Sequence, residues 1–208
     1  MLHVTEIFYS IQGESTRAGL PCVFVRLAGC NLDCRYCDTP QAHAQGAPMS
    51  AEDIAAETLN HDTPLVEITG GEPLLQPETP RLADALVYAN RTVLIETNGT
   101  IALPERRSFH AILDWKTPGS GHPDSFRRDN LVRLRAGDEL KFVICDRTDF
   151  DWAVERLREI PGAIPVLFSP AATLPPPQLA DWILAARINV RLQLQLHKIL
   201  WPTPDRPR

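Results

Sequence analysis

The chain has 208 residues, which is long enough to bury a core within one domain. A hydrophobic content of 44%, with 11 glycines and 19 prolines, excludes a low-complexity or disordered chain. The formal net charge of −5 at pH 7 argues against broad binding to nucleic acids or anionic membranes.

No apolar run approaches the roughly 20 residues that a membrane-spanning helix needs. The N-terminal stretch MLHVTEIFYSIQGES lacks the basic and apolar regions of a signal peptide. We therefore expect a cytoplasmic protein with no membrane association. Disulfides are rare in such a reducing compartment, and the five cysteines are an odd number. Clustered cysteines in this chain are thus expected to bind a metal or a cofactor.

Strands and helices are predicted to alternate along the chain. The first strand is expected at residues 22–27, where the apolar, β-branched run CVFVRL ends in Ala-Gly. Ser50 is expected to cap a helix over 51–60, because Asp53 completes a capping-box-like pattern. Further strands are predicted at 65–69, 92–96, 111–115, 140–144, 165–169 and 190–196. Further helices are predicted near 80–88, 151–160 and 178–187.

Seven strands with intervening helices indicate an α/β fold with a parallel sheet, open or closed into a barrel. No repeat and no linker of boundary size interrupts the chain, so we expect a single domain over residues 1–208. A polar loop is predicted at 119–130. The tail, residues 202–208, is expected to be frayed and flexible.

Side-chain alternation predicts that polar groups share one face of the sheet. In 22–27, three apolar residues share one face, opposite Cys22, Phe24 and Arg26. The same pattern places Val66 and Ile68 on one face and Glu67 and Thr69 on the other. Val93 and Ile95 likewise lie opposite Leu94 and Glu96. Near the end of the chain, Leu192, Leu194 and Leu196 lie opposite Gln193, Gln195 and His197. Since α/β folds carry their ligand sites at the carboxyl ends of the strands, we expect a common site there. The alternative is that these residues only lie at solvated strand ends.

The segment GCNLDCRYCDTP, residues 29–40, holds Cys30, Cys34 and Cys37. A structural zinc site would need a fourth ligand from elsewhere, with His43, Cys22 and Cys145 as candidates. A ferredoxin-type cluster also takes four thiolates, whereas three on one loop suit a [4Fe–4S] cluster with one iron open to another ligand.

This CxxxCxxC spacing resembles the signature of the radical S-adenosylmethionine superfamily. Tyr36 resembles the aromatic residue that contacts the adenine in such enzymes, and Gly70-Gly71-Glu72-Pro73 resembles the motif that meets the methionyl amino group. Glycines let backbone approach a ligand, and a carboxylate suits an ammonium partner. The resemblance implies a partial, shortened (β/α)6-type barrel in which S-adenosylmethionine ligates the fourth iron.

Six sequence blocks are similar to the 7-carboxy-7-deazaguanine synthase family: residues 6–15, 21–39, 68–76, 95–100, 139–144 and 194–198. The resemblance implies a lyase that converts 6-carboxy-5,6,7,8-tetrahydropterin to 7-carboxy-7-deazaguanine with loss of ammonia, for queuosine and other 7-deazapurines. It also implies Mg²⁺, an electron donor such as flavodoxin or ferredoxin, and a homodimer.

The resemblance implies three sets of site residues. Arg26 would clamp the substrate carboxylate as a bidentate pair. The other substrate contacts would be Ile11, Gln12, Gly13, Glu14, Thr69, Glu96, His197 and Pro202, with Glu14, Glu96 and His197 as polar helpers; no side chain is expected to be catalytic, since the radical comes from S-adenosylmethionine. Contacts to S-adenosylmethionine would come from Tyr36, Cys37, Asp38, Gly71, Glu72, Asp114, Trp115, Lys116, Ser169, Pro170 and Ala171.

Thr39 would give its hydroxyl to Mg²⁺, which keeps most of its shell as water and substrate oxygens; the alternative is a turn-forming hydroxyl beside Pro40. Ser15 stands where many family members have a second glycine. Cys22 and Cys145 are expected to be core thiols.

Two rival functions remain open on the sequence. An activase of glycyl-radical enzymes shares the cysteine spacing, but the inward set of Arg26, Glu96 and Gln12 favours a small polar substrate over a protein partner. A zinc-binding interaction module would explain the cysteines without any enzymatic activity.

Overall fold

The computed structural model describes residues 1–202, and within them a single sheet of nine strands forms the centre of the fold. The strand order is β3-β1-β2-β4-β5-β6-β7-β8-β9, so β3 and β9 are open edges and the barrel is partial. The strands are β1 (Leu2–Ile11), β2 (Pro21–Leu27), β3 (Ala47–Met49), β4 (Leu65–Gly70), β5 (Thr92–Thr97), β6 (His110–Asp114), β7 (Glu139–Ile144), β8 (Val166–Pro170) and β9 (Arg191–Leu192).

From β2 to β9 every neighbouring pair is parallel, whereas β1 is antiparallel to both β2 and β3. The predicted α/β class with a largely parallel sheet is therefore confirmed. The N-terminal strand β1 and the short β3 were not predicted. Because an antiparallel neighbour needs no crossover helix, β1 could not be found from strand–helix alternation.

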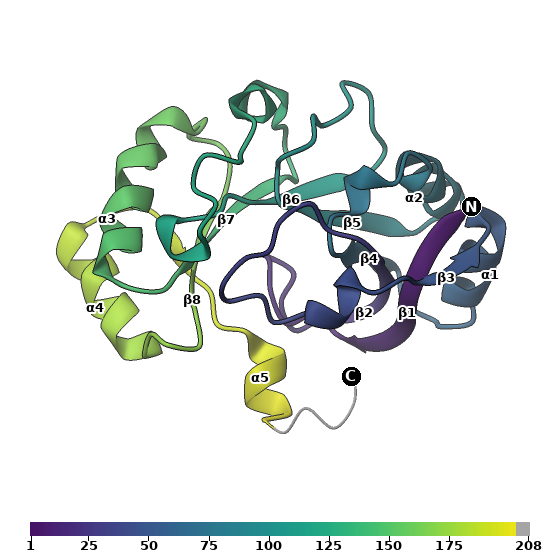
Figure 1. Ribbon diagram of the computed structural model, residues 1–208, viewed down its shortest axis with the longest axis horizontal. Helices are drawn as coiled ribbons and strands as arrows, with labels where there is room; N and C mark the ends of the chain where they lie inside the picture. The colour runs from purple at the N-terminus through teal and green to yellow at the C-terminus, as the bar shows by residue number, and fades with distance from the viewer. Residues whose placement is uncertain (203–208) are drawn as a thin grey trace.

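Four α-helices cover the sheet: α1 (Ala51–Leu59), α2 (Thr79–Tyr88), α3 (Arg147–Arg156) and α4 (Pro176–Ala186). In Figure 1, α1 and α2 lie at the end with the N-terminal strands, and α3 and α4 at the other end. The predicted cap of α1 is confirmed, since the Asp53 amide donates to Ser50 Oγ at 3.0 Å and Ser50 Oγ donates to Asp53 Oδ2 at 2.6 Å.

The predicted alternation holds in the first three parallel strands. Val66 and Ile68 are completely buried with the helices in the main core, as are Val23, Val25, Leu27 and Ile95. A smaller apolar cluster lies on the opposite, polar face, made of Cys22, Phe24, Leu65, Leu94 and Ile112. Cys22 is thus a core thiol as predicted, but Cys145 is only half buried.

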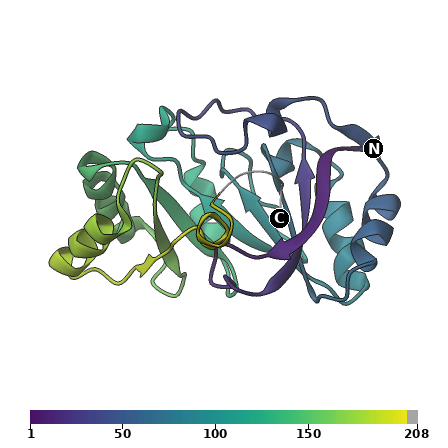
Figure 2. The ribbon, with the colours of Figure 1, turned by 90° about the horizontal axis from the view of Figure 1, so that it is seen from below.

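The strand predicted at 190–196 is present only at its start, as the two-residue β9. Only Arg191 and Leu192 pair with β8, and Leu192 and Leu194 are exposed. The chain leaves the sheet edge there, because the Leu196 amide donates to the Gly13 carbonyl at 2.9 Å and begins α5 (Leu196–Leu200). Figure 2 shows α5 nearly end-on, beside the middle of the sheet and not at its edge.

Two helix starts and one loop also differ from prediction. Helix α3 begins four residues earlier, since Asp146 accepts the Asp149 amide as an N-cap. Helix α4 begins within the three prolines, whose fixed φ suits the first helical turn. The predicted loop 119–130 includes parts of two 3-10 helices, Pro118–Ser120 and Arg128–Arg133.

In the described part of the chain, every helix is too short or too polar to cross a membrane. The predicted flexible tail falls outside the described residues, except for Pro202.

Candidate active site

A cavity of about 1070 Å³ opens at the carboxyl ends of the parallel strands. Its wall is completed by loop 29–40, by the turn after β1 and by α5. It brings together most of the predicted site residues: Ile11, Gln12, Gly13, Glu14, Arg26, Cys30, Cys34, Tyr36, Cys37, Asp38, Thr39, Thr69, Gly71, Glu96, Asp114, Lys116, Ala171, His197 and Pro202. The polar faces of several strands therefore share one site, as the alternation predicted.

The three cysteines of loop 29–40 are all free thiols on the wall of this cavity. Burial raises the pKa of Cys30 and of Cys34. Within residues 1–202, no three His, Cys, Asp or Glu side chains converge on one point as ligands of a single metal ion. The three thiols line one cavity, as a [4Fe–4S] cluster held by three cysteines requires.

Two consecutive glycines let loop 29–40 approach the end of β4. A Cβ on Gly70 would clash with the Leu27 carbonyl, and one on Gly71 with the Gly29 carbonyl. Gly70 also has a φ of 137°, which side-chain-bearing residues rarely adopt. The Glu72 amide donates to the Gly29 carbonyl at 2.8 Å. The glycines thus hold the cysteine loop directly against the strand.

The Glu72 carboxylate is completely buried and lies outside the cavity wall. Its Oε1 accepts hydrogen bonds from the Leu74 amide at 2.9 Å and from Thr97 Oγ1 at 2.8 Å, and its Oε2 accepts from the Asn98 amide at 2.7 Å. Glu72 therefore ties the end of β4 to the end of β5. The role predicted for it, pairing with an ammonium group, would require these bonds to be exchanged.

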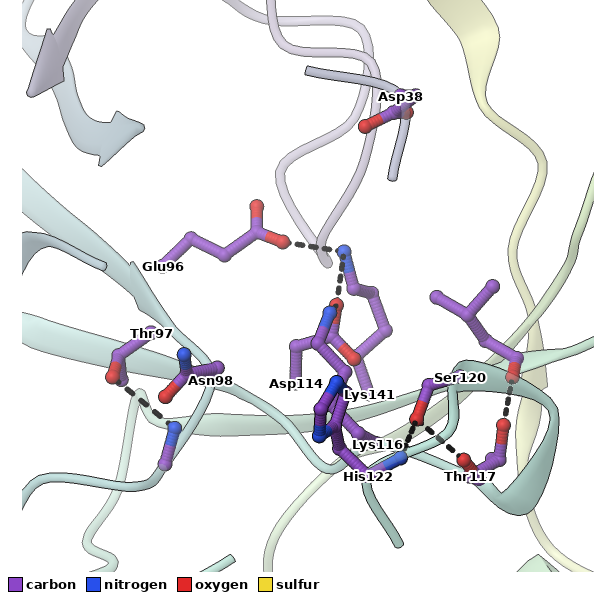
Figure 3. A network of polar contacts seen from close by, with 12 residues as sticks. Asp38, Glu96, Thr97, Asn98, Asp114, Lys116, Thr117, Ser120, His122 and Lys141 are labelled. Carbon is purple, nitrogen blue, oxygen red and sulfur yellow. Dashed lines mark hydrogen bonds and ion pairs between the residues drawn. The ribbon is translucent and has the colours of Figure 1, made fainter. Parts of the chain in front are cut away.

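Lys141 of β7 lies at the centre of an ionic cluster on the cavity floor. Its Nζ donates to Glu14 Oε2 at 2.9 Å and to Glu96, and lies 3.5 Å from Asp114 Oδ2. Figure 3 shows Lys141 between Glu96 and Asp114. Burial disfavours an ammonium, yet these carboxylates raise the pKa of Lys141 well above its usual value.

The carboxylates of this cluster differ in their pKa. Burial disfavours ionisation of Glu14, but Lys141 and a hydrogen bond from Gln195 hold its pKa below the ordinary value. The pKa of Glu96 is raised, because burial and the charges of Glu14 and Asp114 outweigh the attraction of Lys141. The carboxylates on the floor of the cavity are thus only partly neutralised by the charge of Lys141.

A second cation, Lys116, lies on the cavity wall and shares Asp114 with Lys141. Its Nζ donates to Asp114 Oδ2 at 2.8 Å and lies 5.8 Å from the centre of the Tyr36 ring. Although burial opposes it, Asp114 raises the pKa of Lys116. Asp114 keeps Oδ1 without a hydrogen-bond partner among residues 1–202. This wall therefore offers both an aromatic face and a free carboxylate oxygen.

Arg26 of β2 is held in a fixed orientation. Its Nε donates to Glu6 Oε1 at 2.6 Å, and its guanidinium carbon lies 5.7 Å from the centre of the Phe8 ring. Phe8 in turn stacks on Phe24, with ring centres 5.0 Å apart. Because only Nε pairs with Glu6, the two terminal nitrogens have no partner among residues 1–202 and can bind another acceptor.

The segment around α5 closes the cavity from the far end of the chain. The His197 ring lies so close to Gly13 that any side chain at position 13 would clash with it. Burial lowers the pKa of His197, which favours its neutral form. Lys198 Nζ lies 3.3 Å from Asp38 Oδ2 and ties α5 to the cysteine loop.

Three other predicted contacts lie outside the cavity wall: Trp115, Ser169 and Pro170. Trp115 points into the core, where its ring stacks on Phe126 at 4.3 Å and on Phe142 at 5.7 Å. The reason is alternation, since Trp115 follows Asp114 at the end of β6 and takes the opposite face. The Trp115 side chain is therefore not available to a ligand in the cavity.

The polar residues of the cavity wall that were not predicted include Glu67, Lys141, Gln195 and Lys198. Glu67 and Gln195 were placed on the polar face by alternation, but without a role. Lys141 falls within a block that resembles the family, and its alternation with Leu140 and Phe142 was a usable signal.

Three comparisons with known proteins agree with this geometry. The family model of the radical SAM superfamily matches residues 24–113. A 7-carboxy-7-deazaguanine synthase of Chlorobaculum tepidum is 45% identical over 213 residues, covering 98% of this chain and 96% of its own length. One of Koribacter versatilis is 42% identical, covering 98% of each chain.

Among solved structures, QueE from Escherichia coli superimposes with a TM-score of 0.77, at 24% identity and over 94% of both chains. At that identity the likeness concerns the fold alone. The similarity to the two curated relatives extends over nearly the whole chain and is not confined to the cysteine loop.

Proposed function

The chain belongs to the 7-carboxy-7-deazaguanine synthase family, and from this premise we propose how its cavity holds the substrate and the cofactors. The protein is a radical S-adenosylmethionine enzyme that converts 6-carboxy-5,6,7,8-tetrahydropterin to 7-carboxy-7-deazaguanine with loss of ammonia, a step of 7-deazapurine biosynthesis. It uses a [4Fe–4S] cluster, S-adenosylmethionine and an external electron donor. When bound, the cluster and S-adenosylmethionine supply the radical chemistry, and the protein supplies binding, orientation and exclusion of water.

One observation supports the assignment of residues above all. A single cavity is lined both by the three free cysteines of loop 29–40 and by the polar floor around Arg26 and Lys141. Cys30, Cys34 and Cys37 would hold the cluster. Tyr36, Asp38, Gly71, Asp114, Lys116 and Ala171 would then contact S-adenosylmethionine, since all of them line the same cavity as the cysteines.

Arg26 would bind the substrate carboxylate. Its Nε is already paired with Glu6, and this leaves the two terminal nitrogens for a bidentate pair with a carboxylate. Gln12, Glu14, Thr69, Glu96 and His197 would contact the pterin, with Ile11, Gly13 and Pro202 completing the wall. The neutral form of His197 leaves it able to donate or accept one hydrogen bond.

Thr39 would give its hydroxyl to Mg²⁺ beside the substrate. Its Oγ1 lies on the cavity wall and donates to Asp38 Oδ1 at 3.2 Å, so one oxygen-rich corner of the cavity holds both residues. Oxygen ligands of this kind suit Mg²⁺, which needs few protein ligands.

The family resemblance also suggests further properties of the protein. Flavodoxin or ferredoxin would be the electron donor. A cytoplasmic location suits the three free thiols of the cluster loop, since a reducing compartment keeps them from forming disulfides. A homodimer would follow the family resemblance, and residues 1–208 would act as a single domain.

The test is an anaerobic reaction of the reconstituted protein with S-adenosylmethionine, a reductant, Mg²⁺ and 6-carboxytetrahydropterin, followed by mass spectrometry. We expect a product at the mass of the substrate minus ammonia. Deoxyadenosine without that product would contradict the substrate, and retention of one zinc with no iron would contradict the cluster.

A further inference from the structure

Glu67 differs from the other acids on the cavity floor. Glu14, Glu96 and Asp114 all lie within reach of the Lys141 ammonium. Glu67 does not: across residues 1–202 its carboxyl has one hydrogen-bond partner, the Gln12 side-chain amide, which donates to Oε2. A buried carboxyl without a cation is costly to ionise. A bound ligand could supply the hydrogen-bond donors that Glu67 lacks.

The side chain of Glu67 is almost fully buried, with 3% of the residue exposed, and yet it lines the cavity. It lies on β4 in register with Phe24 of β2 and Leu94 of β5. Gly71 is four residues further along the chain, roughly 13 Å away at the usual rise of a strand. Glu67 therefore lies at the deep end of the cavity, away from the cysteine loop.

The surroundings of Glu67 suit a flat ring with a polar edge. Phe8 and Phe24 stack on each other and both line the cavity, and Leu94 belongs to the apolar cluster beneath it. Apolar and aromatic side chains combined with a few buried polar groups fix the orientation of a small ligand. A pterin offers such an edge in its 2-amino-4-oxopyrimidine ring, where N3–H and the 2-amino group donate in the same direction.

We propose that Glu67 is a specificity-determining residue that accepts two parallel hydrogen bonds, from N3–H and the 2-amino group of the pterin, and releases its proton to solvent as the substrate binds. The inference rests on the proposed function, which makes the pterin the substrate. Each carboxylate oxygen has two lone pairs, so Oε2 accepts from the pterin as well as from Gln12.

The charges around Glu67 support the proton release. Burial, then the negative charge of Glu96 on β5, raises the pKa of Glu67 to about 8. Glu14 from the turn after β1 adds to this rise, and Lys141 on β7 opposes it. Cys22 on β2 faces the same carboxyl but stays protonated, because burial and Glu67 raise its pKa as well. The free enzyme at pH 7 thus holds a protonated Glu67, whose proton would oppose the N3–H donor.

The experiment is calorimetric titration of the reconstituted holoenzyme with 6-carboxytetrahydropterin, anaerobically, with S-adenosylmethionine and without reductant, so that no turnover occurs. Two buffers of different ionisation enthalpy at pH 7 report the protons released per substrate bound. We expect about one proton for the native chain. In Glu67→Gln we expect no release and a Kd at least ~10-fold higher, because the amide places a donor or an uncharged acceptor against the pterin edge.

Two comparisons make the result specific. A substrate analogue without the 2-amino group is expected to lose at least ~10-fold in affinity for the native chain but little for Glu67→Gln. Glu52→Gln on the exposed face of α1, with an unchanged cluster spectrum, is the matched control and is expected to match the native chain.

Equal affinity of Glu67→Gln and the native chain, or equal proton release, would overturn the inference while leaving the substrate assignment intact. A native chain that binds the pterin tightly without releasing a proton would show that Glu67 stays a neutral acid and donates to the ligand, which also overturns the inference. If the native chain does not bind the pterin at all, the proposed function falls together with the inference.

Discussion

Lys141 Nζ donates to Glu14 Oε2 at 2.9 Å, although the two residues are 127 positions apart in the chain. This bond joins β7 to the turn that follows the antiparallel strand β1. It fixes a part of the cavity wall that does not belong to the parallel sheet. The same ammonium also binds Glu96 of β5, so one side chain sets the positions of two residues that we assign to the substrate.

Replacing Lys141 with methionine is expected to leave Glu14 and Glu96 buried without their cation. Breaking a buried pair by removing one partner costs about 3–5 kcal/mol in the free energy of unfolding. Urea denaturation of the apoprotein measures it. Lys198→Met is the control, because Lys198 and Asp38 are both about half exposed and such pairs contribute at most ~1 kcal/mol. Similar losses in both variants would refute a central role for Lys141.

Arg26→Lys is expected to weaken binding of the carboxylated pterin by about 10- to 100-fold, since an ammonium cannot form two parallel bonds to a carboxylate. Tetrahydropterin without the carboxylate should bind both forms equally. Equilibrium titration with each ligand gives the two affinities. Arg81→Lys, on the exposed surface of α2, controls for the substitution itself. An equal loss for both ligands would argue against a carboxylate clamp.

Gly71→Ala is expected to displace loop 29–40 from β4, because the new Cβ would overlap the Gly29 carbonyl. Iron bound per chain after reconstitution should fall well below that of the native chain. Gly162→Ala is a matched control, since a Cβ there meets no atom within 4 Å. Normal iron content in Gly71→Ala would show that the loop tolerates the shift.

Cys34→Ala is expected to abolish cluster binding, and with it the brown colour and the roughly four irons per chain. Cys145→Ala should keep both, because Cys145 lies outside the cavity wall and burial raises its pKa to about 12. Iron analysis and the visible spectrum distinguish the two variants. A brown Cys34→Ala protein would contradict the three-cysteine site.

The stability of the protein is expected to depend on pH through Glu67. Its pKa rises from 4.5 to about 8 on folding, so between these values the folded chain holds a proton that the unfolded chain has lost. Stability from this group therefore falls as pH rises from 4.5 to 8. The melting temperature of Glu67→Gln, minus that of the native chain, should increase over this range and level off above pH 9. A constant difference would refute the shift.

Much of the fold could be predicted from local patterns. The parallel strands beside the core showed apolar alternation and clear stops, as in 65–69 before Gly70. The strand predicted at 190–196 is shorter than expected, although Leu192 and Leu194 alternate as in a strand. Its pairing with β8 stops at Leu192, while β8 itself continues to Pro170, because the chain turns away and bonds to Gly13. Alternation describes a segment and does not reveal how far that segment stays paired with its neighbour.

The site shows the same limit. The cysteine loop and the two glycines could be predicted because their chemistry lies within a few residues. Lys141 and Glu67 could not be assigned roles, because their meaning depends on partners more than 40 residues away. Glu72 illustrates the reverse: its motif was evident, but its bonds to Thr97 and Asn98 became visible only in three dimensions.

The contact between α5 and the turn after β1 has a consequence for when the protein can receive its cluster during its own synthesis. Gln195 Nε2 donates to Glu14 Oε1 at 2.9 Å across 181 positions, and His197 covers Gly13. The ribosome adds residues from the N-terminus onward, so early segments of a domain cannot pack against later segments until those have been made. The cysteines of loop 29–40 are thus translated well before the segment that closes the cavity. Iron insertion before release of the chain would meet an open, solvent-filled half-site, so cluster loading is expected to follow translation.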